Sequence, residues 1–175
     1  VDASTETISV LHVDDEPDFA DLTTTFLERE DARFDVTIVT DAREGLARLD
    51  DDAFDCIVSD YDMPGLNGLE FLEAVRERQP DLPFILFTGK GSEEVASDAI
   101  SSGVTDYLQK ESGTDQYAVL ANRISNAIDR HQSQLLVERS ERRLREIIDA
   151  VPHLLHVVAA DGTYLLANEA LATFH

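Results

Sequence analysis

The chain has 175 residues, of which 43% are hydrophobic and 29% charged, and its formal net charge is -22. This composition is typical of a folded globular protein, and the length suffices for one domain with a sizeable core and a smaller appendage. No apolar run approaches the roughly 18 residues that span a bilayer, and no basic stretch followed by an apolar core opens the chain. The single cysteine, Cys56, cannot form an internal disulfide. We therefore expect a cytoplasmic protein that is neither exported nor inserted into a membrane.

The acidic excess consists of 21 Asp and 15 Glu, whereas the bases are 12 Arg and only two Lys, Lys90 and Lys110. A carboxylate-covered surface with few lysines suits a protein in concentrated salt, where a Debye length of about 3 Å screens self-repulsion. We therefore expect a halophilic protein, and an acidic mesophilic protein is the alternative. In both cases the lack of a basic face argues against direct binding of nucleic acid.

Short apolar runs alternate with amphipathic stretches along the first 130 residues. The runs expected to form strands are 8–13, 34–39, 54–59, 83–88 and 105–108. The stretches expected to form helices are 17–30, 42–51, 67–79 and 92–102, with a fifth beginning near residue 115. Five strands alternating with five helices predict right-handed crossovers, and hence a doubly wound α/β fold with a parallel sheet covered on both faces.

From about residue 115 to 150 the chain has no Gly or Pro, and apolar side chains recur at steps of three and four. This spacing predicts one helix of about 35 residues, which is too long for a small domain to bury. We expect residues 1–132 to form the domain, which the first half of the helix closes. Residues 133–150 then form a linker that pairs with a partner helix and supports self-association.

The last 25 residues change character again. Apolar stretches at 154–159 and 163–166 flank an Asp-Gly pair at 161–162, which predicts strand, tight turn and strand. Asn168 suits the start of a final helix. Because these elements bury too little surface to fold alone, we expect residues 151–175 to be a truncated second domain.

Polar side chains end four of the expected strands. They are Asp14 and Asp15 after the first, Asp60 after the third, Thr88 at the end of the fourth and Lys110 after the fifth. Each alone is more often a helix cap or a turn residue, but their joint occurrence at the ligand-binding edge of a doubly wound sheet favours a site. Clustered carboxylates repel one another unless a cation joins them, and Mg²⁺ fits because it keeps waters and accepts a phosphate oxygen.

Residues 59–68 match the D-x-x-M-P-x-x-x-G loop of the response-regulator receiver family. Together with the acidic pair, Thr88, and Tyr107 three residues ahead of Lys110, this loop makes residues 6–130 resemble a receiver domain. The resemblance implies a flavodoxin-like five-stranded sheet of order 2-1-3-4-5. It also implies a phosphorelay function, in which a histidine kinase or phosphotransfer protein donates a phosphoryl group in the presence of Mg²⁺.

The resemblance further implies roles for the acidic residues. Asp60 would be the phospho-acceptor. Asp15 would ligate Mg²⁺ directly and Asp14 through water, and the backbone carbonyl of Asp62 would complete the protein ligands.

It implies roles for the neighbouring residues as well. Thr88 and Lys110 would bind the phosphoryl group, and Tyr107 would be the aromatic residue that rotates inward on activation. Asp62 and Lys90, each two residues after a site residue, would tune the lifetime of the phosphoryl group. A receiver of this kind catalyses its own phosphorylation and dephosphorylation.

Two positions depart from the family pattern. Lys110 is followed by Glu111, where the family usually has a cis-proline, so the lysine backbone must be held by other contacts or the loop is more mobile. Thr88 is followed by Gly89, where many members have Ala, which widens access to the site.

The tail resembles the opening of a PAS sensor domain, in which a helix leads to a strand, a D-G turn, a second strand and an N-x-A helix start. The residues that carry this resemblance are 144–152, 161–162 and 168–170. A receiver followed by a helix and a PAS start resembles archaeal multidomain signalling proteins, many of which end in a histidine kinase module. Nothing in these residues shows that kinase.

Two other functions are weighed against the receiver. A Mg²⁺-dependent aspartyl phosphatase needs an acid/base Asp two residues after the nucleophile, a spacing that Asp62 has, but no cap domain is present. A non-phosphorylated dimerisation scaffold would not need the complete acid set. A nucleotide phosphate loop at 89–92 is disfavoured because Phe84 stands where its first Gly belongs. His12, within an apolar run, is expected to be a core residue.

Overall fold

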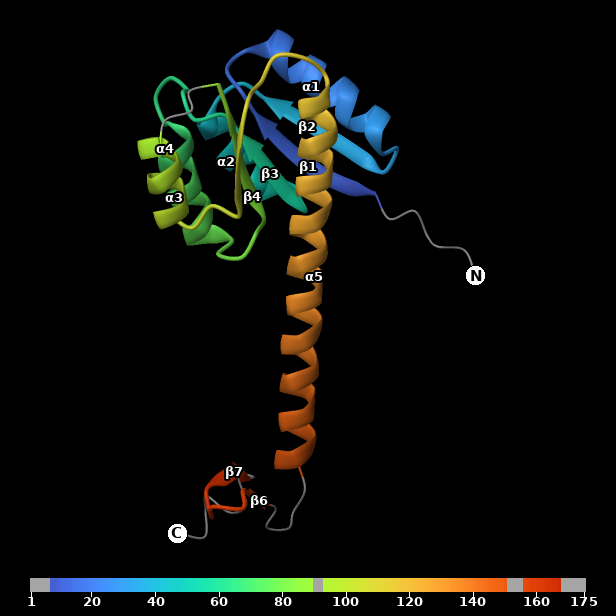
Figure 1. Ribbon diagram of the computed structural model, residues 1–175, viewed down its shortest axis with the longest axis vertical. Coiled ribbons are helices and arrows are strands. Elements are labelled where there is room, and N and C mark those ends of the chain that lie inside the picture. Colours follow the sequence, from blue (N-terminus) through green and yellow to red (C-terminus); the bar gives the residue numbers. More distant parts are fainter. Residues whose placement is uncertain (1–6, 90–92, 151–155, 168–175) are drawn as a thin grey trace. The chain divides into compact units, whose positions relative to one another are not determined.

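The computed structural model describes residues 7–89, 93–150 and 156–167 (Figure 1). The chain divides into two compact units, residues 1–131 and 132–175. Helix α5 (Asp115–Asp149) runs through the boundary between them. No helix in the described ranges is long and apolar enough to cross a membrane.

The first unit contains one parallel sheet. Its strands are β1 (Ile8–Val13), β2 (Phe34–Val39), β3 (Cys56–Ser59), β4 (Phe84–Thr88) and β5 (Asp106–Gln109). They lie in the order β2-β1-β3-β4-β5, which confirms the predicted flavodoxin-like topology. Val13 pairs with Val39 and Ser59, and Thr88 pairs with Gln109. Strands β2, β1 and β3 therefore end in register with one another, as do β4 and β5. Strand β4 continues two residues past Leu86, the partner of Ser59. The residues that follow the strands meet at one edge.

Four further helices accompany the sheet: α1 (Pro17–Glu30), α2 (Ala42–Asp51), α3 (Gly68–Arg78) and α4 (Glu93–Ser101). Alternate strand residues point to opposite faces, so each face has its own core. Leu11, Ile57 and Leu86 pack with residues of α2, α3 and α4. Val10 and Phe87, on the other face, pack with α1 and the first half of α5 (Figure 1). Burial on both faces explains why the central strands are continuous apolar runs.

Helix α3 begins with a capping box, which fixes the end of the loop that follows β3. Asn67 accepts hydrogen bonds from the backbone N–H groups of Leu69 and Glu70, and Glu70 accepts one from the N–H of Asn67. Gly65, with φ of 85°, makes the turn before it. The loop that carries Asp60 is therefore held at both ends by regular structure.

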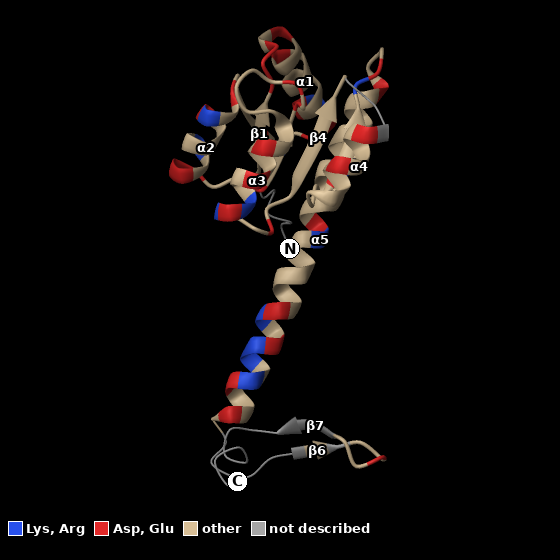
Figure 2. Cartoon of the chain, turned by 90° about the vertical axis from the view of Figure 1, so that its left-hand side faces the viewer, with Lys and Arg blue, Asp and Glu red and all other residues tan. Residues whose placement is uncertain are grey.

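The second unit contains the rest of α5 and a hairpin of β6 (His156–Val158) and β7 (Tyr164–Ala167). Gly162, with φ of 88°, closes the hairpin turn, which confirms the predicted strand, turn and strand. The final helix expected from Asn168 lies outside the described residues. Acidic and basic residues are interspersed along the last part of α5, within residues 138–149 (Figure 2). Apolar side chains are exposed in the same half of the helix. These are Leu135, Leu136, Val137, Leu144 and Ile147.

Candidate functional site

A cavity of about 360 Å³ opens at the carboxyl edge of the sheet. It is lined by Asp15, Glu16, Asp60, Asp62, Thr88, Gly89 and Lys110. These residues come from the ends of β1, β3, β4 and β5, as the register of the strands requires. The structure thus brings together the strand-end residues that the sequence singled out.

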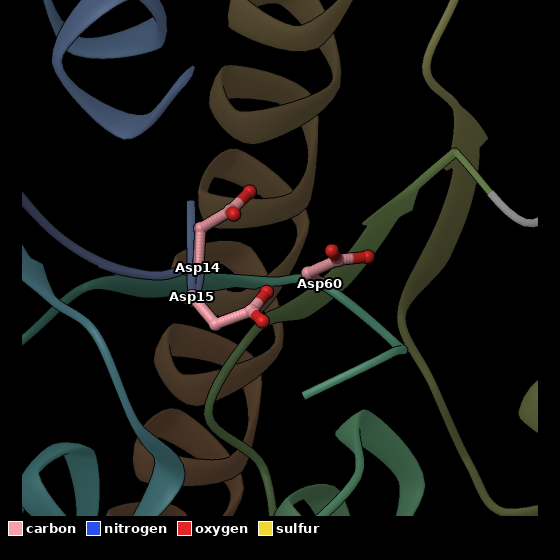
Figure 3. Close-up of side chains that lie close together, drawn as sticks. All are labelled: Asp14, Asp15 and Asp60. Atoms are coloured by element: carbon pink, nitrogen blue, oxygen red, sulfur yellow. The ribbon is translucent and has the colours of Figure 1, made fainter. Parts of the chain in front are cut away.

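Three carboxylates meet beside this cavity (Figure 3). One oxygen each from Asp14, Asp15 and Asp60 lies within 4.8 Å of the others. Asp14 is fully buried, Asp60 is buried and Asp15 is half-buried. Partial burial raises the pKa of Asp15, and the negative charges of Asp14 and Asp60 raise it further. The three groups therefore repel one another in the absence of cations.

Lys110 provides one positive charge to this set. Its Nζ lies 2.8 Å from Oδ2 of Asp14 and 3.2 Å from Oδ2 of Asp60. The same ammonium lies 4.1 Å from the centroid of the Phe19 ring, a cation–π contact that the sequence did not reveal. Burial lowers the pKa of Lys110, but the hydrogen bonds and charges of the two carboxylates outweigh it, so the pKa is raised. Lys110 is therefore charged at neutral pH.

One ammonium cannot balance three carboxylates, and the excess negative charge lies where the oxygens converge. Oxygen ligands in this number suit a hard divalent cation, with water completing its coordination. The donor set of Asp14, Asp15 and Asp60 thus fits Mg²⁺.

Backbone hydrogen bonds fix the residues of the site. The N–H groups of Asp14 and Asp60 donate to the carbonyls of Val39 and Val13, over 3.1 Å and 2.9 Å. The N–H of Lys110 donates to the carbonyl of Thr88 over 2.8 Å. The strand ladder therefore extends one residue beyond the strands and positions these side chains directly.

The other residues that the sequence analysis assigned to the site differ in their burial. Thr88 is fully buried on the cavity wall, whereas Asp62 is exposed at the cavity. Tyr107 packs against the core, and its hydroxyl is buried without a hydrogen-bond partner among the described residues. Burial raises the pKa of Tyr107. Lys90 lies outside the described residues, so its expected role in tuning the lifetime of the phosphoryl group stays a prediction.

His12 is a core residue, as predicted. It is 1% exposed, and burial together with the charge of Lys110 lowers its pKa to about 4. Its Nε2 lies 3.9 Å from Oδ2 of Asp14, beyond hydrogen-bond distance. A neutral imidazole therefore lies beneath the acidic site.

The loop after Lys110 is held by Gln116, a residue that the sequence reasoning missed. Glu111 at the position of the family's proline indicated either that other contacts hold this backbone or that the loop is more mobile. It did not indicate which side chain would make such contacts.

A doubly wound α/β domain with carboxylates and a lysine at the carboxyl edge of its sheet is a flavodoxin-like domain with an acidic site. The chain belongs to the response regulator receiver domain family, whose model matches residues 10–122. It is therefore a receiver domain of two-component signal transduction.

Curated relatives extend beyond this chain. It is 34% identical over 144 residues to the bacterioopsin transcriptional activator of Halobacterium salinarum, which covers 77% of this chain and 21% of that protein. It is 30% identical over 142 residues to the transcriptional regulatory protein FixJ of Bradyrhizobium diazoefficiens, which covers 80% of this chain and 69% of that protein. The chain thus spans about a fifth of the first relative and about two thirds of the second.

Solved structures share the fold. A CheY-like receiver domain protein from Methanospirillum hungatei is 27% identical, with a TM-score of 0.66 over 74% of this chain and 99% of that chain. A receiver domain protein from Clostridium thermocellum is also 27% identical, with a TM-score of 0.64 over 74% of this chain and 98% of that chain. Both matches cover nearly the whole of the known structure, so its fold is present here in full.

Proposed function

We propose that this chain accepts a phosphoryl group from a partner histidine kinase or phosphotransfer protein onto Asp60. The observation that carries the proposal is the position of Asp60 on the cavity wall. Its Oδ2 lies 3.2 Å from the Lys110 ammonium, and Thr88 lines the same cavity. An anionic phosphoryl group entering there meets a nucleophilic oxygen, a fixed positive charge and a hydroxyl donor.

In the proposed step, a carboxylate oxygen of Asp60 attacks phosphorus and forms the oxygen–phosphorus bond of an acyl phosphate. The bond between phosphorus and the donor imidazole nitrogen breaks, and its electron pair stays on the protonated ring. Lys110 neutralises a phosphoryl oxygen, and the Thr88 hydroxyl donates to another. Since the attacking group needs no proton removed, these side chains contribute mainly by positioning and by stabilising charge.

The carboxylates of Asp14, Asp15 and Asp60, with the backbone carbonyl of Asp62, would hold Mg²⁺. When bound, the ion supplies charge neutralisation at the phosphoryl oxygens as a Lewis acid. Asp62, at the cavity, and Lys90 are proposed to tune how long the phosphoryl group persists. Tyr107 is proposed to report phosphorylation by changing its packing against the core.

The chain is proposed to be part of a longer, salt-adapted cytoplasmic receiver-PAS signalling protein. Residues 1–132 form the receiver, 133–150 a signalling helix that self-associates, and 151–175 the start of a PAS-like domain. The β6–β7 hairpin, the exposed apolar side chains of α5 and the net charge of -22 support these assignments. The greater length of the Halobacterium relative supports them as well.

Incubation with a small acyl phosphate and Mg²⁺, followed by intact mass and phosphate assays, tests the proposed function. A covalent adduct with the mass of one phosphoryl group is the expected result. Steady release of phosphate with no adduct would instead indicate the aspartyl phosphatase, and no reaction the dimerisation scaffold.

A further inference from the structure

One buried side chain on α5 holds the loop that carries Lys110. Gln116 lies near the start of α5 and is 8% exposed. Its Oε1 accepts a hydrogen bond from the N–H of Glu111 over 3.0 Å. Its Nε2 donates to the carbonyls of Glu111 and Gly113 over 2.6 Å and 2.7 Å. One amide therefore binds the backbone of this loop at three points.

The three bonds answer a need that Glu111 creates. A proline at this position would have no N–H to satisfy and a fixed φ, whereas Glu111 has both a donor and rotational freedom. A backbone donor that loses water must find an acceptor, and free rotation must be opposed by contacts. A primary amide can do both, because it donates and accepts at once as a peptide group does. Gln116 thus supplies the restraint that the missing proline would give.

The restraint reaches Lys110 through the backbone. On one side, the N–H of Lys110 is bound to the carbonyl of Thr88 over 2.8 Å. On the other side, the next residue is bound at both its N–H and its carbonyl by Gln116. The Lys110 side chain is 11% exposed and reaches the carboxylates of Asp14 and Asp60. With its backbone held on both sides, its ammonium has a defined position relative to the Asp60 oxygen.

We infer that Gln116 is a positioning residue for Lys110 and thereby sets the rate of phosphoryl transfer onto Asp60. The inference rests on the proposed function. A purely structural role for Gln116 would stabilise the loop and the start of α5 without changing the environment of the ammonium or the rate. The two roles predict different results for Lys110 itself.

The small number of lysines makes the ammonium directly observable. With lysine labelled at ¹³Cε and ¹⁵Nζ, the chain gives signals from Lys90 and Lys110 alone, and Lys90→Arg assigns them. Gln116→Met keeps the length of the side chain and removes all three hydrogen bonds. Gln116→Glu keeps the acceptor, loses both donors and places a carboxylate against two carbonyls. If Gln116→Met does not fold, the Lys110 signal and the labelling rate of Gln116→Glu decide between the two roles.

Arg76→Met is the matched control. Arg76 donates to the carbonyls of Leu82 and Gly103 over 2.7 Å and 3.2 Å, and so ties two loops at the opposite edge of the sheet. The substitution Arg76→Met removes side-chain hydrogen bonds to loop carbonyls and leaves the loop of Lys110 unchanged. We expect a lower melting temperature, an unchanged Lys110 signal and a labelling rate within about twofold of wild type.

Gln116→Met should shift the Lys110 signal towards that of free lysine and slow acyl phosphate labelling by about tenfold or more. An unmoved Lys110 signal, or a labelling rate within about twofold of wild type, would overturn the inference. The signal is measured without a phosphodonor, so it tests the positioning even if wild type is not labelled. Absence of wild-type labelling counts against the proposed function instead.

Discussion

The lack of a side chain at Gly68 allows the loop after β3 to close against Asp60. A Cβ at this position would lie 2.4 Å from the carbonyl oxygen of Asp60 and 2.9 Å from Cα of Tyr61. These are backbone atoms, and they cannot yield without moving the site. At Gly89 a Cβ would meet only Cδ of Lys110, at 3.9 Å, which is an ordinary contact. Neither glycine has a positive φ, so the two positions differ only in the space available.

We therefore expect Gly68→Ala to lower the free energy of unfolding by about 2 kcal/mol and to slow labelling of Asp60. Gly89→Ala should change stability by less than about 1 kcal/mol. Urea denaturation of the two variants checks the prediction. Equal stabilities would show that the close approach to Asp60 does not constrain the loop.

The Mg²⁺ assignment makes a prediction about Asp15. Millimolar Mg²⁺ should raise the melting temperature of wild type by binding the native state, and Asp15→Ala should remove most of this gain. Asp18→Ala should keep it, because Asp18 is exposed in the first turn of α1 and outside the carboxylate cluster. Melting curves with and without Mg²⁺ provide the measurement. An equal response of both variants would indicate non-specific binding to the acidic surface.

The raised pKa of Asp15 also determines how Asp15→Ala changes the melting temperature in the absence of Mg²⁺. Its ordinary value is 3.8, and partial burial and neighbouring carboxylates raise it in the folded state. Above the ordinary value the unfolded chain therefore ionises Asp15 more readily than the folded chain does. Ionised Asp15 costs stability at pH 7, so Asp15→Ala should raise the melting temperature of the metal-free protein.

At the scale of elements, α5 is one helix whose first half packs against the receiver core and whose second half exposes apolar side chains. Leu120 and Ile124 are fully buried in the receiver core, whereas Leu144 and Ile147 are 56% and 57% exposed. Ile124→Ala should cost about 2–5 kcal/mol of receiver stability, because it leaves a cavity.

Leu144→Glu should leave the stability of the receiver unchanged and abolish the self-association proposed for residues 133–150. Sedimentation velocity checks the second effect, and a wild-type chain that is monomeric throughout would refute it.

The sequence predicted the described strands and helices of the first unit, because the spacing of apolar residues and the Gly, Pro and capping residues between elements are local signals. The bounds moved by one or two residues where side chains bind backbone. Asn67 is a cap rather than a helical residue, and Asp55, expected within a strand, accepts the N–H of Ser9 through its side chain. The strand ends also predicted which residues would lie together at the carboxyl edge, since the ends of parallel strands meet there.

Contacts that depend on side-chain direction could not be predicted in this way. The place of Lys110 between Asp14 and Asp60, above the ring of Phe19, joins elements far apart in the sequence. The role of Gln116 depends on a loop conformation that no periodicity encodes. The sequence showed Glu111 in place of the family's proline, but it did not show that Gln116 would hold this loop.

At the scale of the whole molecule, a net charge of -22 makes self-repulsion a general cost of folding. Neutral salt should offset that cost by screening. We expect the melting temperature to rise by several degrees as KCl is raised from about 0.2 M to about 2 M, and to level off as the Debye length approaches about 3 Å. A flat or falling melting temperature over this range would argue against salt adaptation.

The central claim is that Asp60 accepts the phosphoryl group, and intact mass after exposure to an acyl phosphate and Mg²⁺ tests it most directly. Wild type should gain the mass of one phosphoryl group. Asp60→Asn should gain none while melting at the same or a slightly higher temperature, because the substitution relieves carboxylate crowding. Asp62→Asn should still be labelled, since only the backbone carbonyl of Asp62 has a proposed role in binding. Labelling of Asp60→Asn at the wild-type rate would contradict the account.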